Sequence, residues 1–415
     1  MKLFKSLLVA PATLGLLAPM NANATEVNLN EISNYSDVES IEFDTSFNND
    51  DSTLNNLLAG GEGLVDDHSH DGGFSETTTA SFSANFYLGS TDTDGNALST
   101  GESDDAISAG YDFGIGLSTS FTGEDSLNIT LDAGNAGATG YAEFDGDNTT
   151  DSLNVDGVSY SFPLAGATVM VGDNTDGSAL FSTACVYGGP SNTLDDCGNV
   201  NAGITAGGAM LGASYDFDNG FTAAVGMAGT ESDGIFSEES TDAWGINGAY
   251  TGDNYGVSVT YGVVEATSGT PAALTGEEDT FTALNAYYTP EGLPSISVGY
   301  EMGDIGGADA SVDEQESFFV GLTWDEIGPG SIGVALGHSN TIEGSDEEYM
   351  YELYYDYPVN DGVTITPLVF VKEVHTSVHD AVGQDDTTGV MVKTCLLYTS
   401  PSPRDLSTSR MPSSA

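Results

Sequence analysis

The stretch AMLGASYDFDNGFTAAVGM, residues 209–227, gives the first evidence of the fold. Apolar side chains occupy alternate positions before an Asp-Asn-Gly turn at 218–220, and again after it. A period of two is that of a β-strand, and Asn-Gly accepts the positive φ angles of a tight hairpin. The stretch therefore predicts an antiparallel hairpin. A water-soluble sandwich also contains such hairpins. The number of strands and the lengths of their connections must therefore decide between a sandwich and other all-β folds.

The same alternation recurs along the chain and predicts sixteen strands. In residues 105–121, six apolar side chains alternate with small or polar ones, which suits a tilted strand that crosses a bilayer with water on its other side. The predicted strands are 77–88, 105–121, 126–134, 152–163, 167–172, 203–217, 220–229, 242–250, 255–264, 280–288, 295–302, 316–324, 331–339, 347–357, 362–373 and 387–394.

The predicted connections alternate between short turns and long acidic loops. Short turns at one end and long loops at the other are typical of an outer-membrane barrel, whereas a β-sandwich has no reason to sort its loops in this way. The pattern predicts an all-β fold: a 16-stranded antiparallel transmembrane β-barrel with short periplasmic turns and long acidic extracellular loops. The alternative is a secreted acidic β-sandwich or adhesin-like surface protein, which would need no detergent.

The order of segments along the chain predicts one membrane domain behind a cleaved leader. Residues 1–24 carry two lysines, an apolar run and a small-x-small site, as a signal peptide does. Residues 25–76 are polar and acidic, which indicates a disordered periplasmic lead. The porin-like barrel is expected over 77–394. Residues 395–415 show no alternation and read as a non-native sequencing-adapter tail, so we expect a truncated closing strand and poor assembly.

The chain has 64 acidic and six basic residues, for a net charge of −58. This balance excludes nucleic acid as a partner. Uncompensated carboxylates around a pore attract cations and repel anions, unless salt screens them so that they select nothing. The acids expected to line the pore are Asp112, Asp132, Asp216, Glu352 and Asp356 on strands, with Asp173, Asp176, Asp195 and Asp196 in the longest loop.

That longest loop, residues 173–202, contains Cys185 and Cys197, the only cysteines before the tail. In an oxidising compartment we expect them to form a disulfide, which stabilises the fold by roughly 3 kcal/mol in the chain-entropy model.

Motifs for catalysis or cofactor binding are missing from the sequence. It has no glycine-rich phosphate loop, no CxxC pair and no Gly-x-Ser-x-Gly elbow, and the histidines are not placed for a Ser-His pair. Two Asp-rich loops, 92–96 and 145–148, lack the Glu of a calcium loop at the twelfth position. We expect no catalytic site, no cofactor and no metal site.

Several segments resemble the porins of marine cyanobacteria, grouped with carbohydrate-selective and iron-uptake porins. The carriers are MKLF at 1–4 and LLVAPA at 7–12, LNVDGVSYSFP at 153–163, Gly172-Asp173, and ASYDFDNGF at 213–221. The resemblance covers residues 1–394. Members usually place an S-layer-homology domain before the barrel, but here only ISNYSDV at 32–38 is similar to its opening, so anchoring to peptidoglycan is not expected.

The resemblance implies passive uptake of small hydrophilic solutes and ions across the outer membrane, with sugars or inorganic iron as candidate cargo. It also implies that the third long loop, which holds Cys185 and Cys197, folds into the lumen. Outer-membrane lipid is the expected surroundings, and a homotrimer is the assembly common among porins.

Overall fold

A computed structural model describes residues 78–95, 106–137, 143–144, 146–204, 208–229, 242–265, 278–306, 313–373 and 384–399. The predicted signal peptide and periplasmic lead lie outside the described residues, and so do residues 400–415 of the predicted tail.

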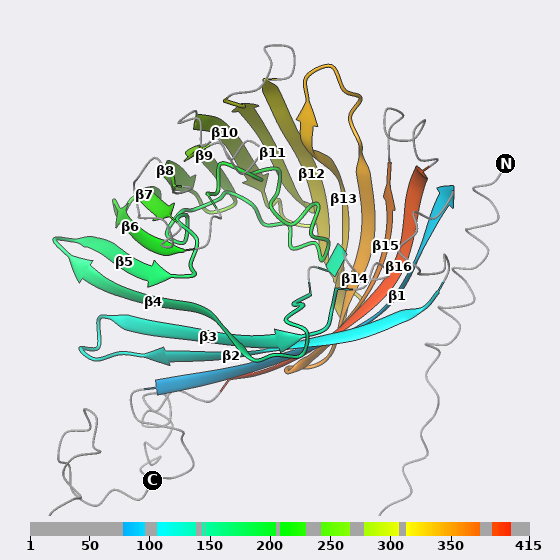
Figure 1. The fold of residues 1–415 in the computed structure, drawn as a ribbon, viewed down its shortest axis with the longest axis horizontal. Helices are drawn as coiled ribbons and strands as arrows, with labels where there is room; N and C mark the ends of the chain where they lie inside the picture. Colours follow the sequence, from blue (N-terminus) through cyan, green and yellow to red (C-terminus); the bar gives the residue numbers. More distant parts are fainter. Residues whose placement is uncertain are drawn as a thin grey trace, which may run out of the picture. The chain divides into compact units, whose positions relative to one another are not determined.

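Sixteen antiparallel strands in the described residues form one closed barrel, and each strand pairs with its neighbours in sequence (Figure 1). This confirms the predicted fold class and contradicts the β-sandwich alternative. The strands are β1 (Thr78–Gly95), β2 (Ser108–Thr119), β3 (Ser126–Gly134), β4 (Asn154–Leu164), β5 (Ala167–Asp173), β6 (Ala209–Asp216), β7 (Phe221–Gly229), β8 (Asp242–Thr251), β9 (Tyr255–Glu265), β10 (Glu278–Tyr288), β11 (Ser295–Asp304), β12 (Glu314–Ile327), β13 (Gly330–Ile342), β14 (Met350–Asn360), β15 (Val363–Lys372) and β16 (Gln384–Thr399).

Three strands begin or end five or more residues away from the predicted position. β1 runs on to Gly95, because its last residues pair with β16 where a loop was expected. β6 begins at Ala209 and not at 203, because residues 203–204 belong to a loop inside the barrel. β16 continues to Thr399, and residues 395–399 pair with 81–85 of β1. The expected open edge at the seam is therefore wrong for this structure, although the origin of the tail sequence stays a prediction.

The outer face of the barrel carries large apolar side chains with nothing packed over them. Ile107 is 74% exposed, Leu211 46% and Val225 44%. A sandwich would bury these side chains under a second layer of protein, whereas a membrane-spanning barrel presents them to lipid. An apolar outer face of this kind is stable where lipid tails, and not water, cover it.

Aromatic side chains gather beside the short turns, at the end where β2 runs into β3 and β6 into β7. Ring pairs join neighbouring strands there, with centroids 4.7 Å apart for Phe221 and Tyr250 and 5.6 Å for Tyr250 and Tyr255. Tyr and Trp are favoured where a barrel wall passes from lipid to water. The aromatic residues therefore mark one edge of the apolar band.

The inward face is not small and polar throughout, which corrects the expectation of a uniformly polar lumen. On β14, β15 and β16 the inward residues Met350, Tyr354, Leu368, Phe370 and Met391 are at most 3% exposed. They belong to one apolar cluster with side chains from two loops that enter the barrel, which are Ala136, Phe144, Tyr187 and Leu194. The barrel thus has a hydrophobic core on one side of its interior, and this core holds the loops in place.

Candidate constriction site

The loop that joins β5 to β6 is here called L3, and its described residues 174–204 run along the inner side of the barrel wall (Figure 1). Three of its backbone amides donate hydrogen bonds to inward side chains of three strands. The pairs are Ser182 to Asn247 Oδ1 on β8 at 2.9 Å, Ala184 to Ser258 Oγ on β9 at 2.9 Å, and Val186 to Ser297 Oγ on β11 at 3.0 Å. Short polar side chains on the wall therefore accept hydrogen bonds from loop amides that would otherwise need water as their partner.

The returning limb of L3 is attached by a buried carboxylate. The backbone amides of Asn201 and Ala202 both donate to Glu301 Oε2, at 2.9 and 2.8 Å, and the Asn201 side chain donates to Oε1 at 2.8 Å. Glu301 is only 1% exposed. Because Glu301 accepts three hydrogen bonds from Asn201 and Ala202, it fixes this limb to the wall. Sequence reasoning missed Glu301, because nothing in the sequence of β11 distinguishes it from a pore-lining acid.

A disulfide joins Cys185 on the outgoing limb to Cys197 on the returning limb, with Cα atoms 6.4 Å apart. The predicted disulfide is confirmed. The Cys197 carbonyl oxygen also accepts a hydrogen bond of 2.8 Å from Asn285 Nδ2 on β10. The disulfide thus closes a loop whose two limbs are each bonded to the wall.

L3 lies so close to the wall that two wall positions require glycine. A Cβ atom at Gly226 would lie 1.8 Å from the Gly177 carbonyl oxygen, and one at Gly299 would lie 1.7 Å from the Cys197 carbonyl oxygen. Contacts under 3.0 Å are essentially never made by real Cβ atoms. The glycines in β7 and β11 therefore allow the loop backbone to contact the strand backbone directly.

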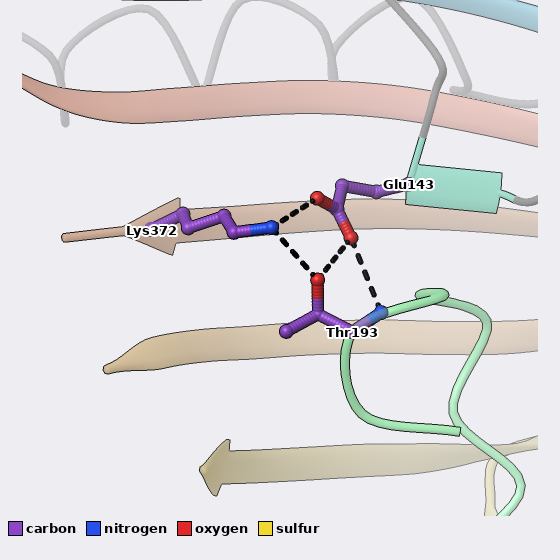
Figure 2. Close-up of polar contacts among 3 residues, drawn as sticks. All are labelled: Glu143, Thr193 and Lys372. Carbon is purple, nitrogen blue, oxygen red and sulfur yellow. Dashed lines mark hydrogen bonds and ion pairs between the residues drawn. The ribbon is translucent and has the colours of Figure 1, made fainter. Parts of the chain in front are cut away.

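The tip of L3, residues 191–194, is held by side chains from two other elements. The Glu143 carboxylate accepts from the Thr193 hydroxyl at 2.8 Å and from the Thr193 amide at 3.3 Å (Figure 2). Lys372 Nζ, at the end of β15, donates to Glu143 Oε1 at 3.1 Å and to Thr193 Oγ1 at 3.0 Å. Glu143 comes from the loop that joins β3 to β4, residues 135–153 and here called L2.

Four of the predicted pore-lining acids lie on the inward face of strands, and two of these are buried. Asp112 is 5% exposed and accepts from Asn85 Nδ2 at 2.8 Å and from the Tyr87 hydroxyl. Glu352 is 3% exposed and accepts from the Tyr187 hydroxyl at 2.5 Å. Asp132 and Asp356 are half-buried, and Asp356 accepts from Thr366 Oγ1 at 2.5 Å. The buried carboxylates bind protein groups and present little surface to a solute.

The fifth strand acid, Asp216, lies at the short-turn end, where it accepts a hydrogen bond of 2.8 Å from the Asp218 amide. The structure therefore places it apart from L3. The loop acids Asp173, Asp176, Asp195 and Asp196 are exposed, at the entry to L3 and near its tip. Although Asp176 is exposed, desolvation by neighbouring protein atoms, followed by the charge of Asp156, raises its pKa.

Two lysines, which the sequence reading did not place, lie inside the barrel. Between residues 78 and 399 the chain has only Lys372 and Lys393 as basic residues. Lys372 forms the ion pair with Glu143, and Lys393 Nζ lies 5.8 Å from the centre of the Tyr87 ring. The sequence could have predicted that both lysines point inward, because each follows an outward-facing valine, Val371 on β15 and Val392 on β16.

Within the part of the chain that the structure describes, no helix combines the length and apolar character needed to cross a membrane. The same residues contain no cluster of three or more His, Cys, Asp or Glu side chains arranged to bind a metal ion.

No protein-family model and no curated protein matches the chain. Among solved structures, it is similar to OprB from Pseudomonas putida, with 13% identity and a TM-score of 0.54 over 78% of this chain and 94% of that one. It is also similar to an anion-selective porin from Comamonas acidovorans, with 14% identity and a TM-score of 0.53 over 78% of this chain and 99% of that one. The likeness is one of fold. At such identities, solute and ion preference do not transfer from one protein to the other.

Proposed function

We propose that the protein is an outer-membrane porin, through which small hydrophilic solutes diffuse passively and cations pass more readily than anions. The observation that carries this proposal is the position of L3, bonded along the inner wall of a closed barrel with an apolar outer face. A barrel of sixteen strands is wide enough to leave an aqueous channel, and a loop fixed inside it narrows that channel.

The charge supports the preference for cations. Asp173 is exposed at the end of β5 and Asp176, Asp195 and Asp196 are exposed on L3, whereas Lys372 pairs with Glu143. Carboxylates in a narrow, partly dehydrated passage raise the local concentration of cations. The Comamonas porin of similar fold is described as anion-selective, so the proposal rests on the charges of this chain and not on that likeness.

The wider setting belongs to the same proposal. A signal peptide over residues 1–24 would carry the chain across the inner membrane, and the barrel would reside in outer-membrane lipid, as a homotrimer. The channel would act without catalysis and without a cofactor. Sugars or inorganic iron are the candidate cargo that the sequence resemblance suggests.

Planar-bilayer recording of the purified protein tests the proposal. In a potassium chloride gradient we expect discrete channel openings and a zero-current potential with the sign of potassium permeation. A potential with the sign of chloride permeation contradicts the cation preference. Absence of channels from correctly folded protein contradicts the proposal as a whole.

Salt concentration separates selection from screening. The Debye length falls from about 30 Å at 0.01 M to about 3 Å at 1 M, so a preference set by exposed carboxylates weakens as salt rises. Neutralising Asp195 and Asp196 together, by D195N and D196N, is expected to reduce the potential at low salt. If the potential is near zero at every salt concentration, the carboxylates select nothing.

A further inference from the structure

L3 is held at its tip and four residues before it by carboxylates of two different elements. At the tip, Glu143 of L2 accepts both the hydroxyl and the amide of Thr193, and its own carbonyl oxygen accepts the Asn192 amide at 2.7 Å. Before the tip, Glu352 of β14 accepts the hydroxyl of Tyr187. We propose that Glu143, Thr193 and Lys372 form a clamp that positions the L3 tip and so sets the conductance and ion selectivity of the channel.

The described residues of L2 contact the barrel wall and each other. Phe144, the neighbour of Glu143, is 3% exposed and its ring lies 5.6 Å from that of Tyr87 on β1. The backbone of L2 is bonded across itself, since the Ala136 amide donates to the Asp147 carbonyl oxygen at 3.0 Å. Glu143 therefore holds L3 from a base that is anchored in the apolar core of the barrel interior.

Lys372 supplies the positive charge that pairs with Glu143 and so stabilises the contact between L2 and the L3 tip. Lys372 Nζ donates to both Glu143 Oε1 and Thr193 Oγ1, so one cation joins the carboxylate of L2 to the tip of L3. The Glu143 side chain is 15% exposed and that of Lys372 37%, so water screens their ion pair only in part. Without the lysine, Glu143 loses its ion pair and the Thr193 hydroxyl oxygen loses a donor, and the tip is expected to move away from L2.

The proposal rests on the proposed channel function, because its effect is seen in the current. Loss of a partly exposed ion pair shifts the equilibrium between the bound and the released L3 tip by about two- to fivefold. The released state would then be populated for part of the time, while the protein stays folded. We therefore expect added open-channel current noise and a larger mean conductance, since the tip would leave the narrow part of the pore for part of the time.

Single-channel recording of matched variants of the full chain tests the clamp. K372M and E143Q each remove the ion pair, and we expect both to raise noise and conductance. The noise and conductance of the double variant should exceed those of neither single variant, because each substitution already breaks the same contact. Two variants serve as controls. K393M makes the same charge change as K372M within the barrel, at a side chain that lies beside the Tyr87 ring. D346N makes the same charge change as E143Q on an exposed loop.

A pair of variants at Thr193 distinguishes positioning from folding. T193S keeps the hydroxyl that donates to Glu143, whereas T193V removes it at similar volume. We expect T193S to retain the noise of the unaltered protein and T193V to match E143Q. Heat-modifiable migration in detergent gels reports whether each variant folds.

The outcomes are distinct. Noise and conductance of K372M and E143Q equal to those of K393M and D346N overturn the clamp while the channel function stands. Equal behaviour of T193S and T193V overturns it as well. If the unaltered, folded protein conducts no current, the proposed function fails and the clamp fails with it.

Discussion

The hydroxyl of Tyr187 on L3 donates a hydrogen bond of 2.5 Å to Glu352 Oε1 on β14, and both side chains are buried inside the barrel. The Tyr187 ring also packs against Phe319 and Tyr354, with centroids 5.2 and 5.8 Å away. Burial, followed by the nearby Glu352 charge, raises the pKa of Tyr187 above its ordinary value, so the phenol stays protonated and remains a donor.

This contact predicts an asymmetric response to mutation. Tyr187→Phe leaves the buried Glu352 carboxylate without its donor, which costs about 1–3 kcal/mol of folding free energy. The double change Tyr187→Phe with Glu352→Met removes both polar groups, and we expect it to be less destabilising than Tyr187→Phe alone. Thermal unfolding in detergent, followed by circular dichroism, measures the order. A double variant less stable than the single one contradicts the argument.

The glycines under L3 predict a second result. Gly226→Ala places a methyl group on the Gly177 carbonyl oxygen, so the loop must shift, at a cost of about 1–3 kcal/mol for overpacking. We expect a lower unfolding temperature and a changed conductance. Gly248→Ala is the matched control, because a Cβ at Gly248 of β8 meets nothing within 4 Å. Equal effects of the two substitutions would show that the close approach is unimportant.

The disulfide between Cys185 and Cys197 predicts a change in stability with little change in current. Its reduction is expected to cost ~3 kcal/mol or less in the chain-entropy model, because both limbs of L3 keep their hydrogen bonds to Asn247, Ser297 and Glu301. Unfolding with and without dithiothreitol measures the first effect and single-channel conductance the second. A large rise in conductance on reduction would mean that the disulfide, and not the wall contacts, holds the loop.

Acid is expected to weaken the turn between β2 and β3 through Asp125. Its carboxylate accepts the Thr122 amide at 2.8 Å and the Tyr160 hydroxyl at 2.7 Å, and these bonds hold the pKa of Asp125 well below its ordinary value. A lowered pKa contributes stability above the unfolded value of about 3.9, and that stability is lost as the pH falls below it. Asp125→Asn should therefore lose stability at pH 7 and respond less to acid between pH 4 and 2, as urea unfolding at several pH values would measure.

The strands were predictable because apolar side chains alternate with small or polar ones along them. Alternation placed β7 and the end of β6 to within one residue, but the start of β6 was predicted six residues too early. The end of β1 was missed, because Asp92 and Gly95 are residues typical of loops and their pairing with β16 depends on a distant segment.

The interior was predictable only in part, since contacts there are made between loops and wall. The disulfide followed from two cysteines in one loop. Glu301 and Glu352 share the inward face with Asp112, and composition does not tell a carboxylate that binds a loop from one that meets water. Glu143 lies in a segment without periodicity, so no sequence signal indicated its contact with Thr193 and Lys372.

The pairing of β1 with β16 has a consequence for biogenesis. The first and last strands of the barrel are each other's neighbours, so every shorter version of the wall has two unpaired backbone edges. Such edges are not tolerated in hydrocarbon. For the membrane location proposed above, insertion must therefore wait until β1 and β16 can pair.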